Sequence, residues 1–280
     1  MIESICIIGA GTMGSGITQV AAQSGFTALL FDLNSEVLER AKISIQKNLI
    51  VLVGKQKITT EEADKIFNSI RFVNNINNCK ADVIIEAIVE KVEAKVSLFN
   101  QLATINSAET IFASNTSSLS ISAIQKNIIA PKRVVGMHFF NPAPLMKLVE
   151  VVRGEQTDEA IAQTIYSLCL QMKKTPVLCK DAPGFIVNRV ARHYYLEAMK
   201  IVEQGIASFE DVDAIMEAAG FKMGPFKLMD LIGMDINLSV TQSMYAAFNH
   251  AERFTPSQIQ IDKVANGELG KKTGRGFYQY

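Results

Sequence analysis

The sequence lacks an excess of charge of either sign. Lysine and arginine together number 28, as do aspartate and glutamate, so the 280-residue chain has a formal net charge of zero. Nucleic-acid-binding proteins normally carry a basic excess, so the composition argues against that class. An anionic ligand would have to be met by a local group of charges or by backbone amides.

Cysteine is scarce, and long apolar runs are missing. The four cysteines form no CxxC pair and none stands at metal-ligand spacing from a histidine, so we expect no metal site and reduced, cytosolic thiols. No apolar run reaches the length of a membrane span, so we expect no membrane partner. The first residues show no signal or transit pattern, which favours the cytoplasm; the alternative is a mature organellar chain without its presequence.

Strand-like and helical patterns alternate over the first 180 residues. Short apolar runs, several of them rich in isoleucine and valine, recur at residues 4–8, 27–31, 81–87, 110–113, 133–137 and 148–152. Runs of this kind, separated by helices, are typical of a parallel sheet covered on both faces. The expected fold class is therefore α/β, with a Rossmann-like, doubly wound, mostly parallel sheet.

The pattern changes near Pro183. Strand-like runs disappear, and helical windows follow one another at residues 185–203, 209–219, 225–231, 236–248 and 256–265. The segment Asp181-Ala182-Pro183-Gly184 interrupts both periodicities and is a plausible linker. The sequence thus predicts a Rossmann-like domain over 1–182 and a smaller all-helical domain over 183–280.

The segment Gly9-Ala10-Gly11-Thr12-Met13-Gly14 fits the pattern GxGxxG. A strand precedes it, a helix follows, and Asp32 ends the next strand 18 residues beyond Gly14, which is the context of a dinucleotide site. A carboxylate there can accept hydrogen bonds from ribose hydroxyls and would repel a 2′-phosphate, which favours NAD over NADP. A flavin and a glycine turn that binds nothing are the alternatives.

Of the three histidines, only His138 falls at the carboxyl end of a predicted strand, where open α/β sheets place their ligands. Glu150 lies in the next apolar strand, and a buried carboxylate there needs a partner. An imidazole oriented by a carboxylate is a suitable base for an alcohol proton. The alternatives are a structural His138 and a Glu150 that points outward from an edge strand.

With these residues in place, the chain resembles the 3-hydroxyacyl-CoA dehydrogenase family, and within it the short-chain 3-hydroxybutyryl-CoA dehydrogenases. The similarity spans nearly all 280 residues. Besides the glycine-rich segment, it rests on ADVIIEAIVEKVEAK, FASNTSSLSI, GMHFFNPAPLMKLVEVV, DAPGFIVNR, GFKMGPFKLMDLIGMD and KKTGRGFY.

The resemblance implies a role for several residues. His138 matches the general base and Glu150 the carboxylate that orients it. Ser117 and Asn188 match residues placed near the reacting hydroxyl or carbonyl, Ser117 also near the nicotinamide. Further positions match contacts of NAD: Glu90, Lys95, Asn141 and Lys272.

The match is weaker where family members hold CoA, on the helix after the second strand. The family's serine is replaced by Asn48, and its lysine falls near Lys55, with Lys42 and Lys47 as rival candidates. A lysine at the end of a helix is often only a solvated charge, so the residue pattern alone leaves this assignment open.

The resemblance implies an NAD-dependent (S)-3-hydroxybutyryl-CoA dehydrogenase that interconverts a short 3-hydroxyacyl-CoA and acetoacetyl-CoA. It also implies a homodimer formed through the helical domain, which would bind substrate and carry the dimer contact. The sequence contains no hydratase domain, so we expect a stand-alone enzyme that acts on short acyl chains. The alternatives are a dehydrogenase of a non-CoA 3-hydroxy acid and a non-catalytic module.

Overall fold

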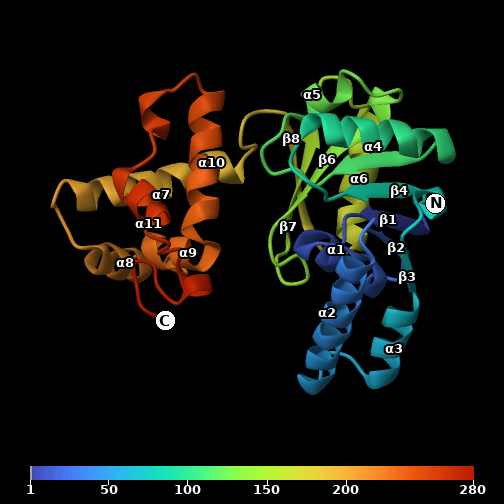
Figure 1. Cartoon of the computed structure of the whole chain (residues 1–280), viewed down its shortest axis with the longest axis horizontal. Helices are drawn as coiled ribbons and strands as arrows, with labels where there is room; N and C mark the ends of the chain where they lie inside the picture. The colour runs from blue at the N-terminus through green and yellow to red at the C-terminus, as the bar shows by residue number, and fades with distance from the viewer. Residues whose placement is uncertain (1) are drawn as a thin grey trace. The chain divides into compact units, whose positions relative to one another are not determined.

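The computed structural model describes residues 2–280, which fall into two compact units that divide between Ala182 and Pro183 (Figure 1). The first unit contains a sheet with helices on both faces, and the second contains helices. The predicted fold class is confirmed. Each unit is described by itself below.

The first unit is built on a sheet of eight strands in the order β3-β2-β1-β4-β5-β6-β7-β8. The strands from β3 to β6 are parallel, β7 runs antiparallel to β6, and β8 runs parallel to β7. Their bounds are β1 Ser4–Ile8, β2 Thr27–Phe31, β3 Ile70–Val73, β4 Val83–Glu86, β5 Ile111–Ser114, β6 Val134–Phe139, β7 Leu148–Arg153 and β8 Thr175–Lys180.

Helices cover both faces of this sheet, as its nearly continuous apolar strands require. Alternate strand residues, among them Ile5 and Ile7, pack in one core with helices α1 (Thr12–Gln23), α2 (Ser35–Gly54) and α6 (Glu159–Gln171). The opposite face carries α4 (Val92–Ile105) and α5 (Ile121–Gln125); there, for example, the Phe99 ring lies 5.5 Å from that of Phe112 on β5.

Helices α2 and α3 (Thr60–Asn68) lie side by side and extend from the sheet (Figure 1). A capping box starts α3: the Thr59 hydroxyl accepts from the amide of Glu62 at 3.1 Å, and the Glu62 carboxylate accepts from the amide of Thr59 at 2.7 Å. The sequence patterns predicted neither α3 nor the two edge strands β3 and β8.

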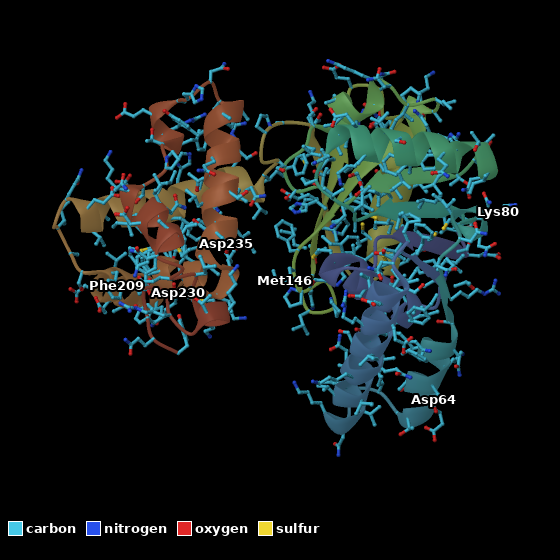
Figure 2. The ribbon with its side chains drawn as sticks, viewed as in Figure 1. Asp64, Lys80, Met146, Phe209, Asp230 and Asp235 are labelled. Atoms are coloured by element: carbon cyan, nitrogen blue, oxygen red, sulfur yellow. The ribbon has the colours of Figure 1, made fainter. Side chains whose placement is uncertain are left out.

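The second unit is helical apart from isolated bridges near the C-terminus. Its core contains Tyr195, Met199, Phe226 and Met229, and Figure 2 shows where Phe209 and Asp230 lie in it. The Asp230 carboxylate accepts from the amides of Phe277 and Tyr278 and so ties the last residues to this core. The α-helices are α7 Val187–Glu203, α8 Phe209–Ala218, α9 Pro225–Ile232, α10 Met234–Ala247 and α11 Gln258–Ala265.

Candidate active site

The glycine-rich loop between β1 and α1 is shaped by close backbone approaches. Gly9 has a φ of 101°, which favours glycine, and a Cβ on Gly14 would lie 1.7 Å from the Gly9 carbonyl oxygen. A Cβ on Gly11 would meet open space. Gly11 is also the N-cap of α1 and offers no side chain to its first amides, so this helix end suits an anionic group.

Asp32 follows β2 directly and is fixed by the backbone. Its Oδ2 accepts from the amide of Ala10 and its Oδ1 from the amide of Asn34, both at 2.9 Å. The carboxylate therefore stands beside the glycine-rich loop, where an acidic residue can accept hydrogen bonds from a ribose. Together with the open space at Gly11, it gives the chain the features that a dinucleotide requires.

A hollow of about 710 Å³ lies between this loop, α2 and the segment after β6. Two cations line it, Arg40 and Lys55, whereas Lys42 and Lys47 are not among its lining residues. Asn48 also lines it and donates to Gln19 Oε1 at 3.1 Å.

Sequence reasoning missed Arg40, although its position on the same helical face as Asn48 could have indicated it. Three residues that the sequence predicts as cofactor contacts also line the hollow: Gly11, Thr12 and Asn141.

His138 and Glu150 lie directly opposite each other on the antiparallel strands β6 and β7. Their side chains are 5% and 1% exposed, and His138 Nδ1 is 2.8 Å from Glu150 Oε2. Because the carboxylate engages Nδ1, the tautomer with the proton on that nitrogen is favoured, and Nε2 becomes the basic nitrogen. The Phe140 ring centroid is 4.4 Å from that of the imidazole.

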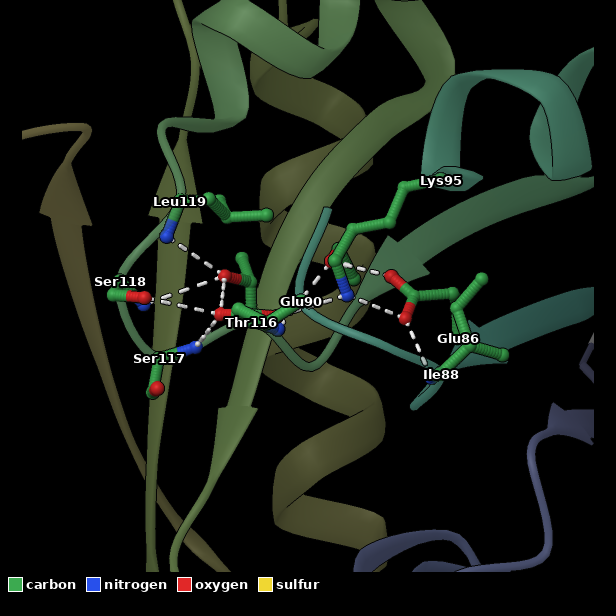
Figure 3. A network of polar contacts seen from close by, with 9 residues as sticks. Glu86, Ile88, Glu90, Lys95, Thr116, Ser117, Ser118 and Leu119 are labelled. Atoms are coloured by element: carbon green, nitrogen blue, oxygen red, sulfur yellow. Dashed lines mark hydrogen bonds and ion pairs between the residues drawn. The ribbon is translucent and has the colours of Figure 1, made fainter. Parts of the chain in front are cut away.

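The loop that carries Ser117 follows β5. Glu90 Oε1 accepts from Thr116 Oγ1 at 2.5 Å, from the Ser117 amide at 3.2 Å and from Ser118 Oγ at 3.2 Å (Figure 3). The Asn115 side chain accepts from the amide of Phe139, which connects this loop to the end of β6. The loops after β1, β4, β5 and β6 all leave the same edge of the sheet, which is the ligand edge in this architecture.

Glu90 and Lys95, both predicted contacts of NAD, form an ion pair with each other, and their roles toward the cofactor stay predictions. Lys95 is 1% exposed, and its ammonium lies 2.6 Å from Glu86 Oε1 and 3.1 Å from Glu90 Oε2. Burial opposes the charged form of Glu90, but the Lys95 charge and the hydrogen bonds from Thr116 and Ser117 hold the pKa of its carboxyl below the usual value.

Two predicted site residues belong to the second unit. Asn188 lies in the first turn of α7. Lys272 lies in the short helix Lys271–Thr273, where its ammonium pairs with the Asp235 carboxylate. Their roles toward substrate and cofactor stay predictions.

Within residues 2–280, no three His, Cys, Asp or Glu side chains gather so that they could hold a metal ion. No helix in that range combines the length and the apolar character needed to cross a membrane.

Comparison with known proteins identifies the family over both units. The model of the 3-hydroxyacyl-CoA dehydrogenase NAD-binding domain matches residues 4–182, and that of the C-terminal domain matches residues 184–280. The 3-hydroxyadipyl-CoA dehydrogenase of Escherichia coli is 45% identical over the whole chain, which spans 59% of that relative. The mitochondrial hydroxyacyl-coenzyme A dehydrogenase of Rattus norvegicus is 39% identical, over the whole chain and 92% of the relative.

A solved structure agrees with these matches. The crystal structure of (S)-3-hydroxybutyryl-CoA dehydrogenase from Ralstonia eutropha superposes with a TM-score of 0.95 at 35% identity, covering 100% of this chain and 99% of that one. The resemblance predicted from the sequence is thereby confirmed. The chain belongs to the 3-hydroxyacyl-CoA dehydrogenase family and is an NAD-dependent oxidoreductase that acts on a CH–OH group.

Proposed function

We propose that this chain is an (S)-3-hydroxybutyryl-CoA dehydrogenase, which interconverts that thioester and acetoacetyl-CoA with NAD. The observation that carries the chemistry is the buried His138–Glu150 pair at the ligand edge of the sheet. The short acyl chain is supported by the similarity to the Ralstonia eutropha enzyme.

In this proposal His138 Nε2 takes the proton of the 3-hydroxyl, and Glu150 stabilises the imidazolium that results. In the opposite direction the imidazolium returns the proton to the 3-ketone. NAD, when bound, accepts or returns the hydride. Ser117 and Asn188 orient the reacting carbon and its oxygen, and such orientation accounts for a large part of many rate enhancements.

The glycine-rich loop and Asp32 would hold the adenosine half of the cofactor. Gly11 and the first amides of α1, which include those of Thr12 and Met13, suit its pyrophosphate, and Asp32 suits its ribose. Glu90, Lys95, Ser117 and Asn141 would serve the nicotinamide half, and Lys272 of the second unit is a further proposed contact of NAD.

For the CoA moiety we propose the face of α2 that lines the hollow. Asn48 and Lys55 lie on it, and Arg40 adds a second cation. The net charge of the chain is zero, so a local cation pair of this kind is what an anionic CoA tail requires.

We also propose a homodimer formed through the second unit. Several large apolar side chains on α9 and α10 are exposed, among them Leu231 at 51% and Ile236 at 50%. Exposed apolar surface of this kind is typical of subunit contacts. A cytoplasmic location stays a prediction, and the rat relative is named mitochondrial.

The substrate is tested by mixing the protein with NADH and acetoacetyl-CoA and following NADH absorbance. Free acetoacetate and 3-ketoadipyl-CoA are the parallel substrates, the second because the Escherichia coli relative is named for a 3-hydroxyadipyl thioester. Rapid oxidation with acetoacetyl-CoA and little with free acetoacetate is the expected result.

Each other outcome identifies a different function. A preference for free acetoacetate would favour the alternative, a dehydrogenase of a non-CoA 3-hydroxy acid. A clear preference in kcat/KM for 3-ketoadipyl-CoA would replace the short-chain substrate and leave the reaction class intact.

A further inference from the structure

A buried lysine holds the segment that joins β6 to β7. Lys174 directly precedes β8 and is 8% exposed. Its ammonium donates to the carbonyl of Ala143 at 2.6 Å and to that of Met146, which Figure 2 shows on this segment, at 2.8 Å. Residues 141–145 of the segment form one wall of the hollow described above. A single side chain therefore fastens this wall at two points.

The position of Lys174 is itself fixed by its backbone. Helix α6 ends in a turn in which Lys173 has a φ of 57°, and the amide of Lys174 donates to the carbonyl of Cys169 at 2.9 Å. The next amide, that of Thr175, donates to the carbonyl of Lys147 at 2.8 Å, where β8 begins to pair with β7. The lysine side chain therefore starts from a point that a helix and the sheet both hold.

Helix α1 holds the same wall from another side. A Cβ on Gly16 of this helix would lie 3.2 Å from Pro144 Cδ and 3.3 Å from Ala143 Cβ, so the wall rests closely on the helix. Ala143 is accordingly only 2% exposed. The wall is thus held between α1 and the Lys174 ammonium, and α2 lines the hollow together with it.

Stability alone does not explain a charge at this place. No carboxylate of residues 2–280 forms an ion pair with Lys174. Burial lowers the pKa of its ammonium, because the charged form loses contact with water. A buried cation that only carbonyls solvate is unfavourable compared with an apolar side chain of similar length. What the ammonium does achieve is to fix two carbonyls of the wall.

We propose that Lys174 is a positioning residue, which holds the segment between β6 and β7 where the hollow can accept the CoA moiety of the substrate. Lys174 is not among the residues that line the hollow, so it acts through the wall. A wall that is fixed before the ligand arrives need not be ordered on binding, and the affinity for the ligand is higher for that reason. The inference rests on the CoA site proposed on α2.

The test compares KM and kcat at saturating NADH. We expect Lys174→Met, which has a similar length but no donor, to raise the KM for acetoacetyl-CoA about tenfold and to leave kcat within about twofold. Proton transfer should persist because strand pairing holds His138 and Glu150 opposite each other. The KM for 3-ketoadipyl-CoA should rise by the same factor, since both thioesters carry the same CoA moiety.

The matched control is Lys173→Met, which removes an exposed charge one residue away and should leave both KM values unchanged. A second variant, Lys174→Gln, keeps an N–H donor without the buried charge, and its KM should lie between those of the unaltered protein and Lys174→Met. A merely structural role would lower the thermal midpoint or the active fraction, and neither of these changes KM.

Three outcomes would overturn the inference. The KM of Lys174→Met could equal that of the unaltered protein, which would make the lysine structural only. If Lys174→Met did not fold, an unchanged KM of Lys174→Gln would have the same meaning. A rise in KM for only one of the two thioesters would place the effect at the acyl group.

The unaltered protein tests the proposed function separately. Its preference for 3-ketoadipyl-CoA would replace the short-chain substrate and leave the comparison of variants intact. Oxidation of NADH with free acetoacetate alone would remove the CoA site and this inference with it.

Discussion

At the scale of single residues, the chemistry depends on His138 and on the carboxylate that faces it across two strands. Nδ1 is engaged by Glu150 at 2.8 Å, and both side chains are buried. A glutamine at position 138 can still donate to Glu150 but has no nitrogen that takes up a proton near neutral pH.

We therefore expect His138→Gln to lower turnover by about a hundredfold or more, which is the usual contribution of a general base. NADH should still bind, because the glycine-rich loop and Asp32 are unchanged. Turnover is measured by NADH absorbance and binding by fluorescence, with His193→Gln as the matched histidine control. Near-normal turnover of His138→Gln would remove the base assignment.

A second residue of interest is the cation Arg192, buried in the helical unit. It is 3% exposed, and its guanidinium donates to the Asn237 carbonyl and the Thr241 hydroxyl, while its Nε has no hydrogen-bond partner. Burial lowers the pKa of this guanidinium to about 10. The guanidinium keeps its charge at neutral pH, but burial makes that charge less favourable in the folded state than in water.

A buried charge without a carboxylate partner is a cost that an apolar side chain of similar length avoids. We expect Arg192→Met to be at least as stable as the unaltered protein toward thermal unfolding. A fall in the free energy of unfolding of more than about 2 kcal/mol would instead show that the guanidinium stabilises the unit.

At the scale of elements, local patterns predicted the central strands well. Strands β1, β2 and β7 stand within one residue of their expected bounds because each is an apolar run flanked by a clear break. The glycine-rich loop and Asp32 could be predicted equally well, because their spacing along the sequence is short. Their functional contacts remain proposals.

The edge strands β3 and β8 escaped prediction because they are short or partly exposed and carry no continuous apolar pattern; β8 even contains Pro176. The pairing of Glu86 with Lys95 joins a strand end to a helix, and no periodicity reveals it. Sequence similarity can identify such a lysine as part of a site, but it does not identify the carboxylates with which the lysine pairs.

Helix α3 offers a test at this scale because its start depends on a capping box. Thr59→Ala removes the hydroxyl that accepts from the Glu62 amide, and loss of such a cap costs about 1 kcal/mol. Urea unfolding should detect that decrease, with Thr60→Ala, one residue further along, as the control. Equal stability of the two variants would mean that the box contributes nothing.

At the scale of the whole molecule, assembly depends on an exposed apolar surface of the second unit. The apolar side chains of Leu231 and Ile236 project from the second unit, and a homodimer through this unit would bury them.

We expect sedimentation of the protein as a dimer over a dilution series and of Leu231→Lys/Ile236→Lys as a monomer, because a desolvated charge opposes association. Ile43→Lys, at a 55% exposed position on α2, is the matched control and should stay dimeric. A monomer at every concentration of the unaltered protein would contradict this arrangement.

In the hairpin of β6 and β7, the residues proposed to transfer the proton lie on the paired strands, and the residues that line the hollow lie on the segment between them. Backbone pairing alone brings His138 and Glu150 opposite each other, whereas the segment that joins the strands, with Asn141 and Leu145, lines the hollow. A slip of one residue would present a valine to the imidazole, but a change in the joining segment leaves the register intact. Descendants of this scaffold could thus diversify their ligands while inheriting the same proton-transfer pair.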